Sequence, residues 1–158
     1  MPDYNASMDF ETAVRIVINT EGGLIDDPHD PGGLTKFGIS QRAYPSLDIR
    51  RLTVDLAKVI YRVDRWDPCK CDQLPDGLRL PVFDMAVNQG VDAAIKALQS
   101  ALSVKVDGDL GPVTIKAAAR VDARARFTAA RVLRYTRTKN FDRYGMGWIT
   151  RAVQVVLE

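Results

Sequence analysis

The chain has 158 residues, of which 46% are hydrophobic, and a formal net charge of +2. This length and composition predict one compact unit with a real core, and no apolar run is long enough to span a membrane. The polar segment 1–5 does not resemble a secretory signal, so we expect synthesis in the cytoplasm without a signal peptide. The closely spaced Cys69 and Cys71 and the single histidine, His29, give little support for a disulfide or a zinc site, and we expect no metal and no cofactor.

Hydrophobic periodicity and capping residues predict a mainly helical chain. A first helix is capped by Asp9 and runs to about Glu21. A segment rich in Gly, Pro and Asp follows, with a short hairpin at 34–39, and Ser40 is predicted to cap a short helix. The remaining predicted helices are, in chain order, one capped by Thr53, one with Pro81 in its first turn, one capped by Asp92, one opened by Pro112, a basic one from about Asp122, and one near Trp148.

Glu21 stands out because it ends an apolar helical stripe and is followed at once by two glycines. On a 3.6-residue period it shares a face with Phe10, Val14 and Val17. Burial disfavours the ionised form of a carboxylate, and the negative end of the helix dipole acts in the same direction. Glu21 is therefore a candidate general acid that keeps its proton near neutral pH. The alternative is an ordinary helix end whose last side chain points into water.

The segment that begins at Glu21 carries a recognisable signature. It reads EGGLIDDPHDPGGLTKFGIS over residues 21–40. This run closely resembles the signature of glycoside hydrolase family 108, which comprises lysozyme-like muramidases common among phage endolysins. The resemblance implies a mainly α, lysozyme-like fold with a small β-hairpin or loop lining the active-site cleft. It also implies cleavage of the β-1,4 bond between N-acetylmuramic acid and N-acetylglucosamine in peptidoglycan.

The C-terminal half carries a second resemblance. Its Leu-Gln, Asp-Gly and Gly-Pro-x-Thr elements, at 98–99, 107–108 and 111–114, are similar to those of small peptidoglycan-binding helical modules. We therefore expect a catalytic region at 1–90 and a peptidoglycan-binding-like region at 91–158, packed together as one compact unit. The alternative is a helix-turn-helix in which these residues only satisfy turn geometry.

Cleavage of a glycosidic bond needs a proton donor and a second group that acts on the opposite face of the sugar. Glu21 is the candidate donor, and Asp30 and Thr35 are candidates for the second role. Their order is similar to the Glu, Asp, Thr triad of phage-type lysozymes, although the last gap is one residue shorter. Water positioned by Thr35 suits an inverting route and direct attack by Asp30 a retaining one, and both remain open. Asp26 and Asp27 are expected to shape turns instead.

Four further residues are candidates for substrate binding. Asn88 ends an Asp-x-Ala-Val-Asn stretch that the resemblance associates with the family, and Gln89 follows it. Their amides can bond the N-acetyl and hydroxyl groups of a glycan. Tyr61 and Trp66 offer aromatic faces that can stack on sugar rings. The alternatives are satisfied buried amides for the first pair and core packing for the second.

Positive charge is concentrated near the C-terminus. Between residues 120 and 151 there are nine basic residues and two acids. Such a segment can bind nucleic acid, an anionic membrane or a cell-wall polymer, or can remain a solvated face. A nucleic-acid or non-enzymatic wall-binding module is thus one alternative, but no recognisable nucleic-acid signature is present and no nucleic-acid partner is expected.

The resemblance also implies a biological setting. We expect a monomeric phage endolysin that acts on bacterial peptidoglycan after release by a holin, which would make it antimicrobial. A lytic transglycosylase is the nearest enzymatic alternative, because it also uses one glutamate but leaves an anhydro-sugar.

Overall fold

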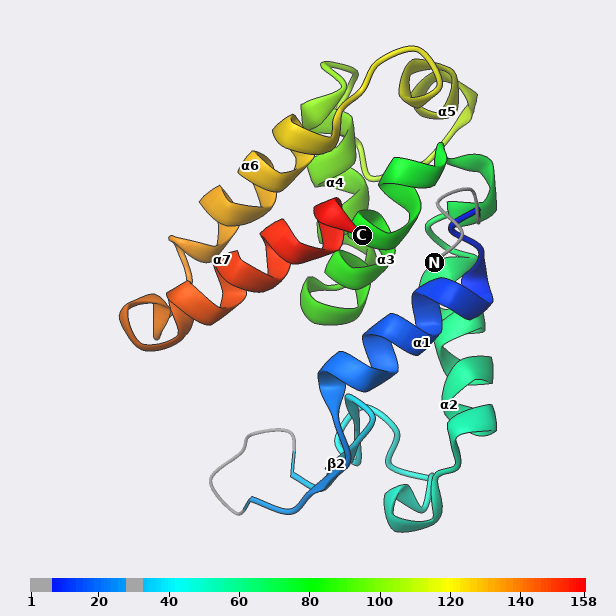
Figure 1. The fold of residues 1–158 in the computed structure, drawn as a ribbon, viewed down its shortest axis with the longest axis vertical. Coiled ribbons are helices and arrows are strands. Elements are labelled where there is room, and N and C mark those ends of the chain that lie inside the picture. The colour runs from blue at the N-terminus through cyan, green and yellow to red at the C-terminus, as the bar shows by residue number, and fades with distance from the viewer. Residues whose placement is uncertain (1–6, 28–32) are drawn as a thin grey trace, which may run out of the picture.

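The computed structural model describes residues 7–27 and 33–158, and within them the chain is mainly α with a small antiparallel sheet (Figure 1). The α-helices are α1 (Phe10–Glu21), α2 (Val54–Tyr61), α3 (Asp76–Gln89), α4 (Val91–Ala101), α5 (Pro112–Ala118), α6 (Arg124–Tyr135) and α7 (Phe141–Leu157). The strands are β1 (Leu24–Ile25), β2 (Thr35–Lys36) and β3 (Ile39–Ser40), in the order β1-β2-β3. This architecture confirms the predicted mainly α, lysozyme-like fold class.

Helix α1 forms as its sequence predicts. The Asp9 side chain caps it by accepting a hydrogen bond from the Thr12 N–H at 2.8 Å. Its apolar stripe, including Val14 and Val17, is fully buried. Gly22 ends the helix with a positive φ of 79°, a value that glycine adopts without steric cost, and turns the chain toward the sheet. The local sequence thus fixes the place of Glu21 at a helix end beside the sheet.

The hairpin predicted at 34–39 is confirmed as β2 and β3, to which β1 adds a third strand. Its turn places Phe37 and Gly38 at φ values of 53° and 78°, which matches the right-handed twist of the strands. The short helix predicted from Ser40 is wrong, because Ser40 belongs to β3. Its hydroxyl instead accepts a hydrogen bond from the Ala43 N–H at 3.2 Å and closes a turn.

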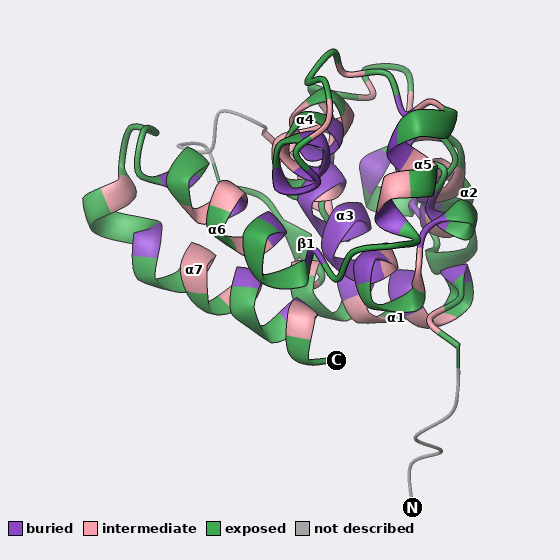
Figure 2. Ribbon diagram, turned by 90° about the horizontal axis from the view of Figure 1, so that it is seen from above, coloured by how far each residue is buried: buried purple, intermediate pink, exposed green. Residues whose placement is uncertain are grey.

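Helix α3 lies at the centre of the molecule and carries much of its buried surface (Figure 2). It packs against α1, α4, α6 and α7. Pro81 was predicted in the first turn, but the helix begins five residues earlier, at Asp76, and Pro75 occupies the N-cap. Burial of the segment on all sides stabilises the helix against the backbone hydrogen bond that Pro81 cannot donate.

The next helices hold the turn-forming residues of the C-terminal half. Gly90, at a φ of 94°, is the N-cap of α4, so the predicted cap at Asp92 is wrong, and Asp92 lies in the first turn. Pro112 opens α5 as predicted. The buried Gln99 amide donates to the Asp107 carboxylate at 2.8 Å and accepts from the Gly108 N–H at 2.9 Å. Gln99 and the Asp107-Gly108 pair therefore hold the loop between α4 and α5 in place.

Helices α6 and α7 pack on each other and on α3, so the C-terminal part of the chain from Arg124 lies against the middle of the core (Figure 1). This packing brings α7 toward the end of α1. Among the described residues, no helix is both long and apolar enough to cross a bilayer.

Candidate active site

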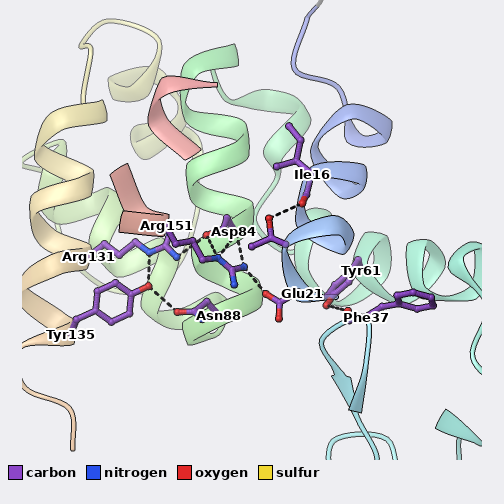
Figure 3. A network of polar contacts seen from close by, with 10 residues as sticks. Ile16, Glu21, Phe37, Tyr61, Asp84, Asn88, Arg131, Tyr135 and Arg151 are labelled. Carbon is purple, nitrogen blue, oxygen red and sulfur yellow. Dashed lines mark hydrogen bonds and ion pairs between the residues drawn. The ribbon is translucent and has the colours of Figure 1, made fainter. Parts of the chain in front are cut away.

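Glu21 does not project freely into water at the end of α1. Its side chain is 20% exposed, and its Oε1 lies 2.6 Å from Nη2 of Arg151 on α7 (Figure 3). The interpretation from sequence considered burial and the helix dipole alone. It did not include a cationic partner, which the structure supplies in Arg151.

Arg151 is itself fixed by a buried acid on α3. Its Nη2 lies 2.6 Å from Oδ1 of Asp84, and its Nε donates to both carboxylate oxygens at 3.0 and 3.1 Å. Asp84 is only 1% exposed and also accepts a hydrogen bond from Nη2 of Arg131 on α6 at 2.7 Å. Burial disfavours the charge of Arg151, but the hydrogen bonds and charge of Asp84, with the charge of Glu21, outweigh it and raise the Arg151 pKa above its ordinary value.

The hairpin turn confines Glu21 from the other side. A Cβ placed on Gly38 would lie 2.7 Å from Glu21 Cγ and 2.6 Å from the Tyr61 hydroxyl oxygen, so only glycine allows this approach. The Phe37 N–H donates to the Gly22 carbonyl at 3.2 Å, and the Tyr61 hydroxyl donates to the Phe37 carbonyl at 2.7 Å. Figure 3 shows Glu21 between Arg151 and this turn.

Tyr61 is predicted as a sugar-stacking residue, but its side chain lies in the core and only its hydroxyl reaches the site. It is 3% exposed, and its ring packs edge-on against Phe83. Burial, and after it the charge of Glu21, raises the pKa of Tyr61 above its ordinary value. Tyr61 therefore holds the hairpin turn as a neutral hydrogen-bond donor.

Trp66 requires a correction. It is fully buried and meets Phe10 and Phe83 edge to face at centroid distances of 5.4 and 5.3 Å. No face of its ring is available to a sugar. Core packing, the alternative considered for Trp66 from its sequence, is therefore what the structure shows.

The predicted second catalytic group is only partly placed. Asp30 and His29 lie outside the described residues. Thr35 lies half-buried on β2, and its hydroxyl donates to the Gly33 carbonyl at 3.2 Å. Asp26 forms an exposed ion pair with Arg50. The structure thus places Thr35 two residues before the turn that contacts Glu21, on the same hairpin.

Asn88 and Gln89 end α3 beside a cavity of about 280 Å³. Asn88 is exposed and accepts a hydrogen bond from the Tyr135 hydroxyl at 2.8 Å. The side-chain amide of Gln89 is buried, and both of its polar atoms lack a partner among the described residues. The cavity is lined by Asn88, Gln89, Arg134, Tyr135, Thr138 and Trp148. It therefore combines the two predicted amides with two aromatic rings and a cation from α6 and α7.

Comparisons with known proteins identify the family of the chain. A family model described as glycosyl hydrolase 108 matches residues 14–90. The solved structure of SagA from Brucella abortus is 31% identical, with a TM-score of 0.85 over 94% of this chain and 91% of that chain. The chain belongs to glycosyl hydrolase family 108. It is therefore a glycoside hydrolase, and the family indicates peptidoglycan as its substrate class. No curated protein matches the chain.

The family 108 segment contains Glu21, the hairpin and Asp84, but the two arginines that neutralise these acids lie beyond it. Sequence reasoning assigned no role to Arg131 and Arg151 and counted them only as part of a basic segment. One local signal was available. Asp84 lies within an apolar buried run, where an acid needs a cationic partner. Among the described residues, no group of His, Cys, Asp and Glu side chains is arranged to hold a metal ion.

Proposed function

We propose that this family 108 enzyme hydrolyses the β-1,4 bond between N-acetylmuramic acid and N-acetylglucosamine, with Glu21 as general acid. One observation carries the proposal. Glu21 is a partly exposed carboxylate held between the Arg151 guanidinium and the Gly38 turn, so its position is fixed while an edge remains open to substrate. A proton donor must be placed within hydrogen-bonding reach of the leaving oxygen, and rigid placement favours this.

The second catalytic group is proposed to come from the segment between residues 30 and 35. In that role Thr35 would position a water for an inverting displacement, or Asp30 would attack directly in a retaining one. Thr35 is the supported member of the pair, because it lies on the same hairpin as the turn that contacts Glu21.

Asn88 and Gln89 are proposed to contact the glycan from the end of α3. Asn88 is exposed at the rim of the 280 Å³ cavity, and Tyr135 fixes its amide by a hydrogen bond. The unpartnered Gln89 amide supplies further hydrogen-bonding capacity once its side chain turns toward a ligand. The region 91–158 would then act as scaffold and as one wall of the substrate site, since α6 and α7 contribute the rest of the cavity.

The proposed setting is a monomeric endolysin of phage type that reaches the cell wall after release from the cytoplasm. A lytic transglycosylase would use the same glutamate, and its anhydro-muramic products distinguish it from a hydrolase.

The test compares wild type with Glu21→Gln on purified peptidoglycan, with the rate of release of soluble fragments as the readout. Loss of a general acid typically lowers the rate by about 10²- to 10⁴-fold. Glu11→Gln is the matched control, since Glu11 lies on the same helix, is exposed and pairs with Lys58. Circular dichroism confirms that both variants fold. A Glu21→Gln protein that cleaves as fast as the Glu11→Gln control would refute the proposal.

A further inference from the structure

The cluster around Glu21 is balanced in charge only when Glu21 is ionised. It contains two cations, Arg131 and Arg151, and two acids, Asp84 and Glu21. Asp84 is shared between both arginines and neutralises one positive charge. The other positive charge is balanced by the Glu21 carboxylate alone, so protonation of Glu21 leaves a net positive charge in a largely buried cluster.

Arg151 is the group through which the cluster acts on Glu21. Its three hydrogen bonds to Asp84 fix the plane of the guanidinium, and Nη2 then points at Glu21 Oε1. A guanidinium held by a bidentate carboxylate retains little freedom to follow a moving partner. The orientation of the Glu21 carboxylate is therefore set by Asp84 acting through Arg151.

The titratable groups that contact Glu21 or its cationic partner, or act on it electrostatically, are Tyr61 on α2, Asp84 on α3 and Arg151 on α7. Arg131 on α6 acts one step away, through Asp84, and the Gly38 turn of the hairpin is uncharged. The Tyr61 hydroxyl donates a hydrogen bond to the Phe37 carbonyl and is neutral, so it adds no charge. Among the described residues, Arg151 is the cation that forms an ion pair with Glu21.

We propose that Arg151 is a positioning residue that orients the Glu21 carboxylate and sets the upper pH limit of cleavage. This inference rests on the proposed role of Glu21 as the acid. A general acid works only while protonated, and a cation in contact with a carboxylate favours loss of its proton, so removal of the Arg151 charge should extend activity to higher pH. Arg151 lies outside the segment that matches the family model, so this tuning is supplied by the C-terminal part of the chain.

The test records cleavage against pH for wild type, Arg151→Gln, Arg151→Lys and Arg131→Gln. In Arg151→Gln we expect a lower optimum rate, because orientation is lost, with KM little changed. We also expect the basic limb of the pH–rate profile, where the rate falls as the pH rises, to move up by about one pH unit or more. At a fixed pH on that limb, this shift is about a tenfold gain in rate relative to the rate at the optimum. Arg151→Lys keeps the charge and should keep the limb near its wild-type position.

Arg131→Gln is the matched control, because it removes a cation from the same carboxylate without touching Glu21. It removes charge from the same cluster without a contact to Glu21, and should therefore move the basic limb of the pH–rate profile less than Arg151→Gln does. The inference would be overturned if the basic limb lay at the same pH in wild type and in a folded Arg151→Gln variant. It would also be overturned if Arg131→Gln moved that limb as far as Arg151→Gln does.

A carbon-13 NMR titration of the Glu21 carboxyl, assigned by its loss in Glu21→Gln, separates this inference from the proposed function because it needs no cleavage. The midpoint should be higher in Arg151→Gln than in wild type. If wild type cleaves nothing yet the midpoint moves, the proposed function fails while the electrostatic role of Arg151 stands. If wild type cleaves and the midpoint does not move, the role of Arg151 fails.

Discussion

Replacing Gly38 by alanine should inactivate the enzyme while leaving it folded. The added Cβ would lie 2.7 Å from Glu21 Cγ and 2.9 Å from Glu21 Oε2. Carbon atoms in favourable contact lie about 3.5 to 4.0 Å apart, so Glu21 must retreat by about 0.8 to 1.3 Å. A displacement of about 1 Å in a catalytic group costs about 10²-fold in rate, and this is the loss we expect.

The backbone effect of the same substitution can be separated from this displacement. Gly38 has a φ of 78°, and alanine in the left-handed region costs about 1–2 kcal/mol. That corresponds to a melting temperature lower by roughly 2–8 °C for a chain of this size. Gly33→Ala is the matched control, since Gly33 has a φ of 68° with nothing within 4 Å of its Cβ position.

The assay is the rate of peptidoglycan solubilisation by the two variants, with thermal unfolding followed by circular dichroism. Both proteins should lose the stability that the backbone effect costs, and Gly38→Ala should lose more because its Cβ also meets the Tyr61 hydroxyl. Only Gly38→Ala should lose most of its activity. Equal activities in two folded variants would show that the close approach of the turn to Glu21 has no part in catalysis.

Three further predictions concern the scaffold. Asp84→Asn removes the charge that the two buried arginines share, and should lower the free energy of unfolding by about 3–5 kcal/mol in urea denaturation; a loss below 1 kcal/mol would contradict the buried network. Asp9→Ala removes the cap of α1 and should cost about 1 kcal/mol at neutral pH. The hydrogen bond from the Thr12 N–H holds the Asp9 pKa below its ordinary 3.8. The stability that this cap contributes is therefore present above pH 3.8 and disappears as the pH falls through the lowered pKa, so the unfolding curves of wild type and Asp9→Ala should converge in acid. Gln99→Leu leaves the Gly108 N–H and its neighbours without their buried acceptor, and amide hydrogen exchange should accelerate at 107–109 while that of α1 stays unchanged.

Local features of the structure could be predicted from the sequence because they depend on residues close together in the chain. Asp9 determines where α1 begins and Gly22 where it ends, and the apolar stripe with a period of 3.6 residues determines its buried face. The hairpin at 34–39 follows from its turn residues. The start of α3 was missed, because a proline usually marks a first turn, and burial overrides that preference at Pro81.

The partners of Glu21 could not be predicted in the same way. Arg151 and Arg131 lie in a segment whose composition equally describes a solvated basic face, and only tertiary packing turns these two inward toward Asp84. For Trp66 the sequence predicts a surface role and the structure shows a buried one, because the position of an aromatic residue along a helix does not tell a sugar-binding face from a core. Long-range pairing and the direction of a side chain are decided by packing against elements far away in the sequence.

The most direct test of the central claim is digestion of purified peptidoglycan in ¹⁸O-labelled water by wild type and Glu21→Gln, with products read by mass spectrometry. We expect one ¹⁸O atom at the reducing end of N-acetylmuramic acid in wild-type products, and a rate of cleavage by Glu21→Gln that is lower by about 10²- to 10⁴-fold. Unlabelled anhydro-muramic products, label on N-acetylglucosamine ends, or equal cleavage by Glu21→Gln would contradict that claim.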